Sequence, residues 1–153
     1  MGFEAVLRTR YSDCLSTHCK DEGCSVSLSP KRGNRVLIDG RKYKKKRNYV
    51  KPLCDFILFD SDPEDIISLT IIELKGGEVD EDEARHAYKQ LKNGALLADS
   101  MARSVDVKAF SPFLVKEKGL NSFARRLLYK EKYWITFRTF REAIIVRRSG
   151  DVI

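Results

Sequence analysis

Two short apolar runs, the first with one aspartate and the second with a Glu-x-Lys triplet, constrain the fold of this chain more than any other feature. The first run spans residues 52–59 (PLCDFILF) and contains Asp55. The second spans residues 69–77 (LTIIELKGG) and contains Glu73 and Lys75. Both are rich in β-branched or aromatic residues and are followed by turn-forming residues, a pattern typical of buried strands. We therefore expect two strands of one sheet.

The alternation of side chains along a strand places Glu73 and Lys75 on one face together with Ile71. A polar connection, residues 60–68, could join the two strands as an antiparallel pair, which would bring Asp55 close to Glu73. A carboxylate and an ammonium group in an apolar strand are costly unless they are paired or bind a metal ion. One interpretation is an ion pair at the strand end. The other is a hard oxygen site for Mg²⁺ or Mn²⁺, because two carboxylates suffice where water and substrate oxygens complete the coordination.

A helix is expected from about residue 82 to residue 99. Its apolar residues recur with the period of one helix face, and acidic residues precede it, as is usual at a helix N-terminus. The apolar residues are Ala84, Ala87, Tyr88, Leu91, Ala95 and Ala98. His86, Gln90 and Asn93 lie on a second face, which is either a solvated surface or an accessory part of the site.

Asp55, Glu73 and Lys75, in this order and between these elements, resemble the motif of the PD-(D/E)xK nuclease superfamily over about residues 34–115. The resemblance implies an α/β fold with a restriction-endonuclease-like core, a mixed β-sheet flanked by helices. It also implies metal-dependent hydrolysis of phosphodiester bonds in nucleic acid. Asp55, Glu73 and the backbone carbonyl of Leu74 would hold Mg²⁺ or Mn²⁺, and Lys75 would orient or activate the attacking water. Gln90 would be an accessory contact on the helix.

The chain departs from the family pattern before Asp55. The proline lies three residues ahead, at Pro52, and Cys54 directly precedes the aspartate. The family commonly adds a glutamate from an N-terminal helix, for which Glu4 and Glu22 are the candidates; we expect Glu22 to be the further metal ligand.

The distribution of charge favours a nucleic-acid partner, with DNA as the expected form. The formal net charge is +7, and seven of the eleven residues from Arg41 to Lys51 are Lys or Arg. We expect this segment to be a basic loop beside Asp55 that contacts phosphates without reading sequence. The alternative is a solvated, flexible loop.

The C-terminal third is also basic and is expected to add a strand at 105–110, a short helix at 121–129 and two strands. These two strands, 133–140 and 143–146, would flank a turn at Arg141 and Glu142 and extend the sheet. Tyr133 or Trp134 could stack on bases, although aromatic residues in strands more often belong to the core.

Two alternatives stay open. Cys14, His18, Cys19 and Cys24 cluster and could bind zinc in a nucleic-acid adaptor, although paired zinc-knuckle spacing is missing. The chain could also be a non-catalytic, nuclease-like nucleic-acid-binding or scaffold module.

We expect one domain over 1–153 and a soluble, cytoplasmic protein without signal peptide or membrane span. A homodimer would allow both strands of a duplex to be cut.

Overall fold

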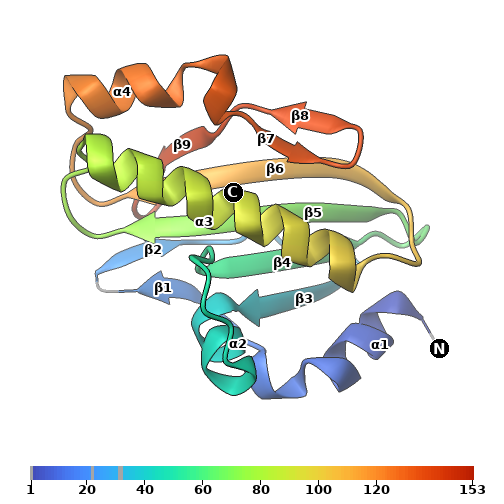
Figure 1. Ribbon diagram of the computed structural model, residues 1–153. Helices are drawn as coiled ribbons and strands as arrows, with labels where there is room; N and C mark the ends of the chain where they lie inside the picture. Colours follow the sequence, from blue (N-terminus) through green and yellow to red (C-terminus); the bar gives the residue numbers. More distant parts are fainter. Residues whose placement is uncertain (1, 22, 31–32) are drawn as a thin grey trace.

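A five-stranded mixed sheet lies at the centre of the computed structural model, within residues 2–21, 23–30 and 33–153 that the structure describes (Figure 1). The spatial order of the strands is β3-β4-β5-β6-β9. Strands β3 to β5 are antiparallel neighbours, and β5, β6 and β9 are parallel. The strands are β3 (Asn34–Asp39), β4 (Phe56–Ser61), β5 (Ile67–Lys75), β6 (Val107–Lys116) and β9 (Ile145–Arg148). The predicted mixed sheet flanked by helices is therefore observed.

The antiparallel pairing predicted for the two apolar runs is confirmed. Phe56 of β4 pairs with Ile72 of β5, which places Asp55 beside the end of β5. Strand β4 begins at Phe56, so Asp55 lies just before the strand and not within it. Strand β3 lies at the edge of the sheet beside β4.

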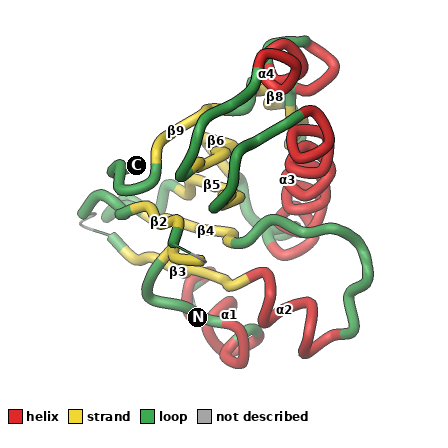
Figure 2. The backbone as a smooth tube through the Cα atoms, turned by 90° about the vertical axis from the view of Figure 1, so that its left-hand side faces the viewer, coloured by secondary structure: helices red, strands yellow, loops and turns green. Residues whose placement is uncertain are grey.

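Helix α3 (Glu81–Met101) connects the parallel strands β5 and β6 and covers one face of the sheet (Figures 1 and 2). Asp80 caps the helix by accepting a hydrogen bond from the amide of Glu83 at 2.9 Å. Gly94 lets the helix approach the segment before β4, since a Cβ atom there would lie 2.4 Å from Cys54 Sγ. The helix predicted at 82–99 is confirmed. The close packing at Gly94 sets the distance between this helix and the segment that carries Asp55.

The sheet has a hydrophobic core on each face. The larger core lies under α3 and includes Leu7, Ile71 and Leu91. The smaller one includes Ile72 and Leu74 and lies under the hairpin of β1 (Cys19–Asp21) and β2 (Cys24–Val26). Figure 2 shows the sheet edge-on, with α3 on one side and β2 and the C-terminus on the other. This division follows from the alternation of apolar residues along β5.

The basic segment after β3 is a helix, and our expectation of a loop was wrong. Helix α2 (Gly40–Arg47) begins after Asp39, whose carboxylate accepts hydrogen bonds from the amides of Arg41 and Lys42. It ends at Arg47 and is followed by Asn48, which has the left-handed conformation favourable at a helix C-terminus (φ 49°). Arg47 lies over the rings of Tyr11 and Tyr43 and anchors the last turn. Capping and tertiary contacts thus overcome the repulsion within the basic run.

The C-terminal prediction was correct in part. Strand β6 occupies Val107–Lys116 and is longer than the predicted 105–110. The predicted turn at Arg141 and Glu142 is wrong, because these residues belong to strand β8 (Phe140–Glu142). Strand β8 pairs with β7 (Ile135–Phe137) in a separate hairpin, and only β9 extends the main sheet. The chain reverses between β7 and β8 at Arg138, with φ 53°.

The remaining elements are short and lie around the sheet: α1 (Phe3–Arg10), η1 (Ser12–Cys14), α4 (Ser122–Leu128) and η2 (Glu131–Tyr133). Helix α4 corresponds to the short helix expected at 121–129, with Asn121 as its cap. Among the described residues, no helix has both the length and the apolar character that crossing a bilayer requires.

Candidate active site

Asp55 and Glu73 meet at the point where β4 begins and β5 approaches its end. The amide of Asp55 donates to Glu73 Oε1 at 3.1 Å, and the amide of Leu74 donates to Asp55 Oδ2 at 2.8 Å. Each carboxylate is thus held by the backbone of the other segment. Both are buried, with 8% of Asp55 and 2% of Glu73 exposed. The antiparallel pairing brings together two acids that are 18 residues apart in sequence.

Lys75 joins the same site from the same face of β5. Its Nζ lies 3.1 Å from Glu73 Oε2 and donates to Gln90 Oε1 at 3.0 Å. Glu83, in the first turn of α3, lies 3.4 Å from the same nitrogen. Gln90 also donates to the carbonyl of Leu53. The structure therefore brings together the four side chains that sequence reasoning selected: Asp55, Glu73, Lys75 and Gln90.

Burial dominates the electrostatics of the two carboxyl groups. It raises the pKa of Glu73 well above its ordinary value, and the Asp55 carboxylate raises it further, while Lys75 lowers it. Burial also raises the pKa of Asp55, against the hydrogen bond from Leu74, and the nearby Asp21 adds to the increase. Two buried acids that repel each other form a site where a bound cation would relieve the repulsion.

This pair fits a hard divalent cation. Carboxylate oxygens are the ligands that Mg²⁺ prefers, and Mg²⁺ usually takes only one or two of them from the protein. Asp55 Oδ1 and Glu73 Oε2 are not used in the hydrogen bonds that hold the pair together. In the described part of the chain, no group of three or more His, Cys, Asp or Glu residues is arranged to hold a metal ion. Among the described residues, a metal here would rely on these two acids, with backbone and non-protein oxygens completing its coordination.

The pocket around these residues has a volume of about 400 Å³ and is mainly polar. Its described lining contains acids from three separate regions and basic residues from α2 and β5. The full lining is Asp21, Arg41, Lys44, Leu53, Asp55, Glu73, Leu74, Lys75, Gly76, Gly77, Glu78, Glu83 and Gln90.

Sequence reasoning missed Asp21 as a member of this site, and it expected Arg41 only as part of the basic segment beside Asp55. Asp21 ends strand β1, and its carboxylate forms an ion pair with Arg41, whose Nε lies 3.8 Å from Asp55 Oδ1. The sequence signal was weak, since Asp21 belongs to a three-residue strand without clear alternation. Only the packing of the β1–β2 hairpin over the sheet places it near Asp55.

The structure bears differently on the other three candidate metal ligands, Glu22, Glu4 and Leu74. Glu22 lies outside the described residues. Glu4 pairs with Arg8 in α1 and lines a different pocket, so the structure does not bring it to the site. Leu74 lines the pocket, and metal coordination by its carbonyl stays a prediction.

Helix α2 is attached directly to the segment that carries Asp55. The amide of Gly40 donates to the carbonyl of Asp55 at 2.7 Å. A Cβ atom at Gly40 would lie only 2.0 Å from the carbonyl oxygen of Cys54. A glycine is therefore needed for this contact, which brings Arg41 and Lys44 to the wall of the pocket.

The cysteines of the N-terminal cluster lie on opposite faces of the sheet. Cys14 belongs to the larger core, whereas Cys19 and Cys24 belong to the smaller one, and all three are buried free thiols. Burial raises the pKa of Cys14 to about 11 and of Cys19 to about 12, which disfavours the thiolate form that binds zinc. His18 is exposed. The structure does not unite these residues in a zinc site.

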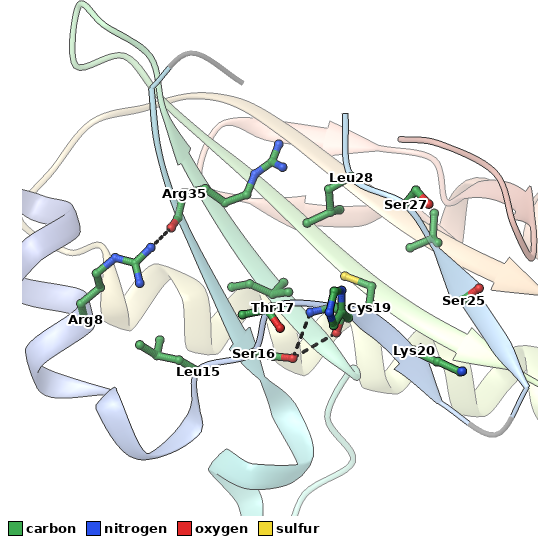
Figure 3. A pocket seen from close by; sticks show the side chains of 13 residues that line it. Arg8, Leu15, Ser16, Thr17, Cys19, Lys20, Ser25, Ser27, Leu28 and Arg35 are labelled. Carbon is green, nitrogen blue, oxygen red and sulfur yellow. Dashed lines mark hydrogen bonds between the residues drawn. The ribbon is translucent and has the colours of Figure 1, made fainter. Parts of the chain in front are cut away.

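A larger cavity, of about 600 Å³, lies beside β3 and the β1–β2 hairpin (Figure 3). It contains basic and hydroxyl side chains, but its arginines are used by the fold. Arg8 pairs with Glu4 and donates to the carbonyl of Arg35, and Arg35 pairs with Asp60 at 2.7 Å. Among its described lining residues there is no carboxylate, so this cavity lacks the chemistry of the Asp55 pocket.

Comparisons of the chain with protein-family models, with curated proteins and with solved structures gave no match. The geometry of the pocket therefore carries the functional argument.

Proposed function

We propose that this protein is a metal-dependent nuclease that hydrolyses phosphodiester bonds in nucleic acid, with DNA as its substrate and a restriction-endonuclease-like core as its fold. One observation carries the proposal. Asp55, Glu73 and Lys75 converge in a single pocket, where two buried acids share a site with an ammonium group. An ion pair between Glu73 and Lys75 alone does not explain why a second carboxylate, Asp55, is buried beside Glu73, with the guanidinium of Arg41 only at 3.8 Å.

Asp55 and Glu73 would hold Mg²⁺ or Mn²⁺. A bound ion would polarise the phosphoryl oxygens, lower the pKa of a bound water and neutralise developing negative charge. In the hydrolysis, a water oxygen forms a bond to phosphorus and the bond from phosphorus to a sugar oxygen breaks. A proton from the water ends on that sugar oxygen.

Lys75 would donate a hydrogen bond to the attacking water or to a phosphate oxygen. Gln90, Glu73 and Glu83 surround its Nζ within 3.4 Å and fix its direction. Such prior orientation matters, because a donor that is already aligned needs no reorganisation as charge develops. Helix α2 supplies positive charge beside the pocket, which favours a polyanionic substrate.

The test is cleavage of labelled single-stranded, duplex and branched DNA and of RNA, in Mg²⁺, Mn²⁺ or EDTA. We expect metal-dependent cleavage of DNA by the wild type, and a loss of about 100-fold or more in Glu73→Ala and Lys75→Ala. Lys116→Ala is the matched control, because Lys116 pairs with Lys75 in the sheet but does not line the pocket.

Two other results would replace the proposal. Binding of nucleic acid without cleavage in every metal would identify a non-catalytic nucleic-acid-binding or scaffold module. Stoichiometric zinc in the purified protein would favour the adaptor interpretation instead.

A further inference from the structure

The described lining of the Asp55 pocket has more acidic than basic side chains. Five acids stand against three basic residues: Arg41, Lys44 and Lys75. Arg41 pairs with Asp21, and Lys75 is surrounded by Glu73 and Glu83. A phosphate group approaching this pocket therefore meets net negative charge unless further cations attract it.

Some basic residues of α2 have contacts in the fold, and Lys44 differs from them. Lys42 Nζ donates to the carbonyl of Leu15 at 3.1 Å, and Arg47 pairs with Asp13. Within the described part of the chain, no ion pair or hydrogen bond holds the Lys44 ammonium group, although its side chain is half-buried and lines the pocket. A lysine fixed at its backbone but without a partner at its tip is available for an anionic ligand.

The position of Lys44 relative to the two carboxylates is set by the fold. It lies one turn after Gly40, whose amide is bonded to the carbonyl of Asp55. The same pocket is lined from α3 by Glu83 and Gln90, so it lies between residues of α2 and α3. Basic side chains of α2 thus lie beside an opening whose interior is acidic.

We propose that Lys44 binds a backbone phosphate of the nucleic acid next to the bond that is cut, so that the substrate strand crosses the pocket between α2 and α3. This inference rests on the proposed nuclease function, because it assigns the placement of that enzyme's substrate. Lys44 acts as a substrate-positioning residue. It attracts the strand into a pocket that otherwise repels it, and it leaves Lys75 for the reacting phosphate.

The test compares Lys44→Gln with Lys46→Gln. Both changes remove one positive charge from α2, but Lys46 is exposed and does not line the pocket. Binding of fluorescein-labelled 20-nucleotide single-stranded and duplex DNA is measured by anisotropy in EDTA, where metal-dependent cleavage cannot consume the probe. A salt series gives the slope of log K against log salt.

We expect Lys44→Gln to weaken binding by about 3- to 10-fold and to reduce the magnitude of the slope by about 0.7 for single strands or about 0.9 for duplex. Lys46→Gln should change the Kd by less than about twofold, and Lys44→Arg should restore binding. In Mg²⁺, Lys44→Gln should raise KM with little change in kcat, as expected for loss of binding that is equal in the ground and transition states.

Equal effects of the two glutamine variants, an unchanged Kd in Lys44→Gln, or no binding by the wild type would overturn the inference. The outcome is separable from that of the proposed function. Lys44-dependent binding without cleavage in any metal refutes the nuclease but retains the phosphate contact. Metal-dependent cleavage that does not respond to Lys44→Gln retains the nuclease and refutes the contact.

Discussion

Asp55 and Glu73 are linked by a hydrogen bond in which the backbone of one holds the carboxylate of the other, with 3.1 Å between the Asp55 nitrogen and Glu73 Oε1. The amide of Leu74 holds Asp55 in return, at 2.8 Å. The two acids are therefore held by backbone hydrogen bonds between the start of β4 and the end of β5. Any change that shifts one segment moves both carboxylates.

Removing the buried charge at position 73 should stabilise the metal-free protein. Burial and the neighbouring Asp55 both disfavour the Glu73 carboxylate, whereas an amide can still accept the hydrogen bond from Asp55. We expect Glu73→Gln to increase the free energy of unfolding by about 1–2 kcal/mol at pH 7, measured by urea denaturation in EDTA. The control is Glu83→Gln, at an exposed residue of the same pocket, which should change stability by less than about 0.5 kcal/mol. A destabilised Glu73→Gln variant would show that the ion pair with Lys75 outweighs the cost of burial.

The gain in unfolding free energy expected for Glu73→Gln should depend on pH. The folded-state pKa values of Asp55 and Glu73 are raised, so the folded protein holds these protons more tightly than the unfolded chain does. Their contribution to stability is present below the unfolded pKa of about 4 and is lost as pH rises through the raised folded pKa values. The difference in unfolding free energy between Glu73→Gln and wild type should thus shrink toward zero as pH falls from 7 to about 4. An advantage that grows on acidification would contradict this sign.

Divalent cations should stabilise the wild type by binding the folded state. At a metal concentration of about 100 times Kd, the stabilisation is about 2.7 kcal/mol, or roughly 5–10 °C in the unfolding temperature. We expect this shift with Mg²⁺ or Mn²⁺ in thermal unfolding, and its loss in Asp55→Asn and Glu73→Gln. Isothermal titration calorimetry gives the stoichiometry independently. An equal thermal shift in all three proteins would place the cation elsewhere.

Gly40 should be intolerant of a side chain. An alanine Cβ would lie 2.0 Å from the Cys54 carbonyl oxygen and 3.2 Å from that of Asp55, so helix α2 or the Asp55 segment must move. We expect Gly40→Ala to lose about 1–3 kcal/mol of stability, together with most of the metal-induced thermal shift. Gly119→Ala is the control, because nothing lies within 4 Å of its Cβ position. Normal metal binding by Gly40→Ala would show that the segment adapts without moving the carboxylates.

Gln90 should affect activity through Lys75. The hydrogen bond from Lys75 Nζ to Gln90 Oε1 helps to orient the ammonium group, and losing it costs about 1 kcal/mol, or about fivefold in kcat. Asn93→Ala removes a similar side-chain amide bond from the same helix, but its partner is the carbonyl of Pro52, outside the pocket lining. We expect Gln90→Ala to lower kcat more than Asn93→Ala does, measured on the same DNA substrate. Equal kcat values in the two variants would show that Gln90 does not contribute to the reaction.

Much of the site geometry could be predicted from local patterns. Alternating side chains on β5 place Glu73 and Lys75 on one face, and a short polar connection made antiparallel pairing with the Asp55 segment the simplest arrangement. The helical period of α3 and its acidic start likewise identified the helix that carries Gln90. These features depend on the covalent geometry of the chain and on burial of apolar faces, and both are visible in the sequence.

Only the tertiary structure decided the surroundings of that site. Asp21 reaches Asp55 because the β1–β2 hairpin covers the second face of the sheet, and no periodic pattern marks a three-residue strand. The basic run became helix α2 because Asp39 caps it, Arg47 lies over two tyrosines and Gly40 permits close approach to Cys54. The sequence by itself determined which residues are candidates for the proposed chemistry and which face of the sheet or helix each occupies. Contacts between distant segments decided which charges surround them, because such contacts have no signature in local spacing.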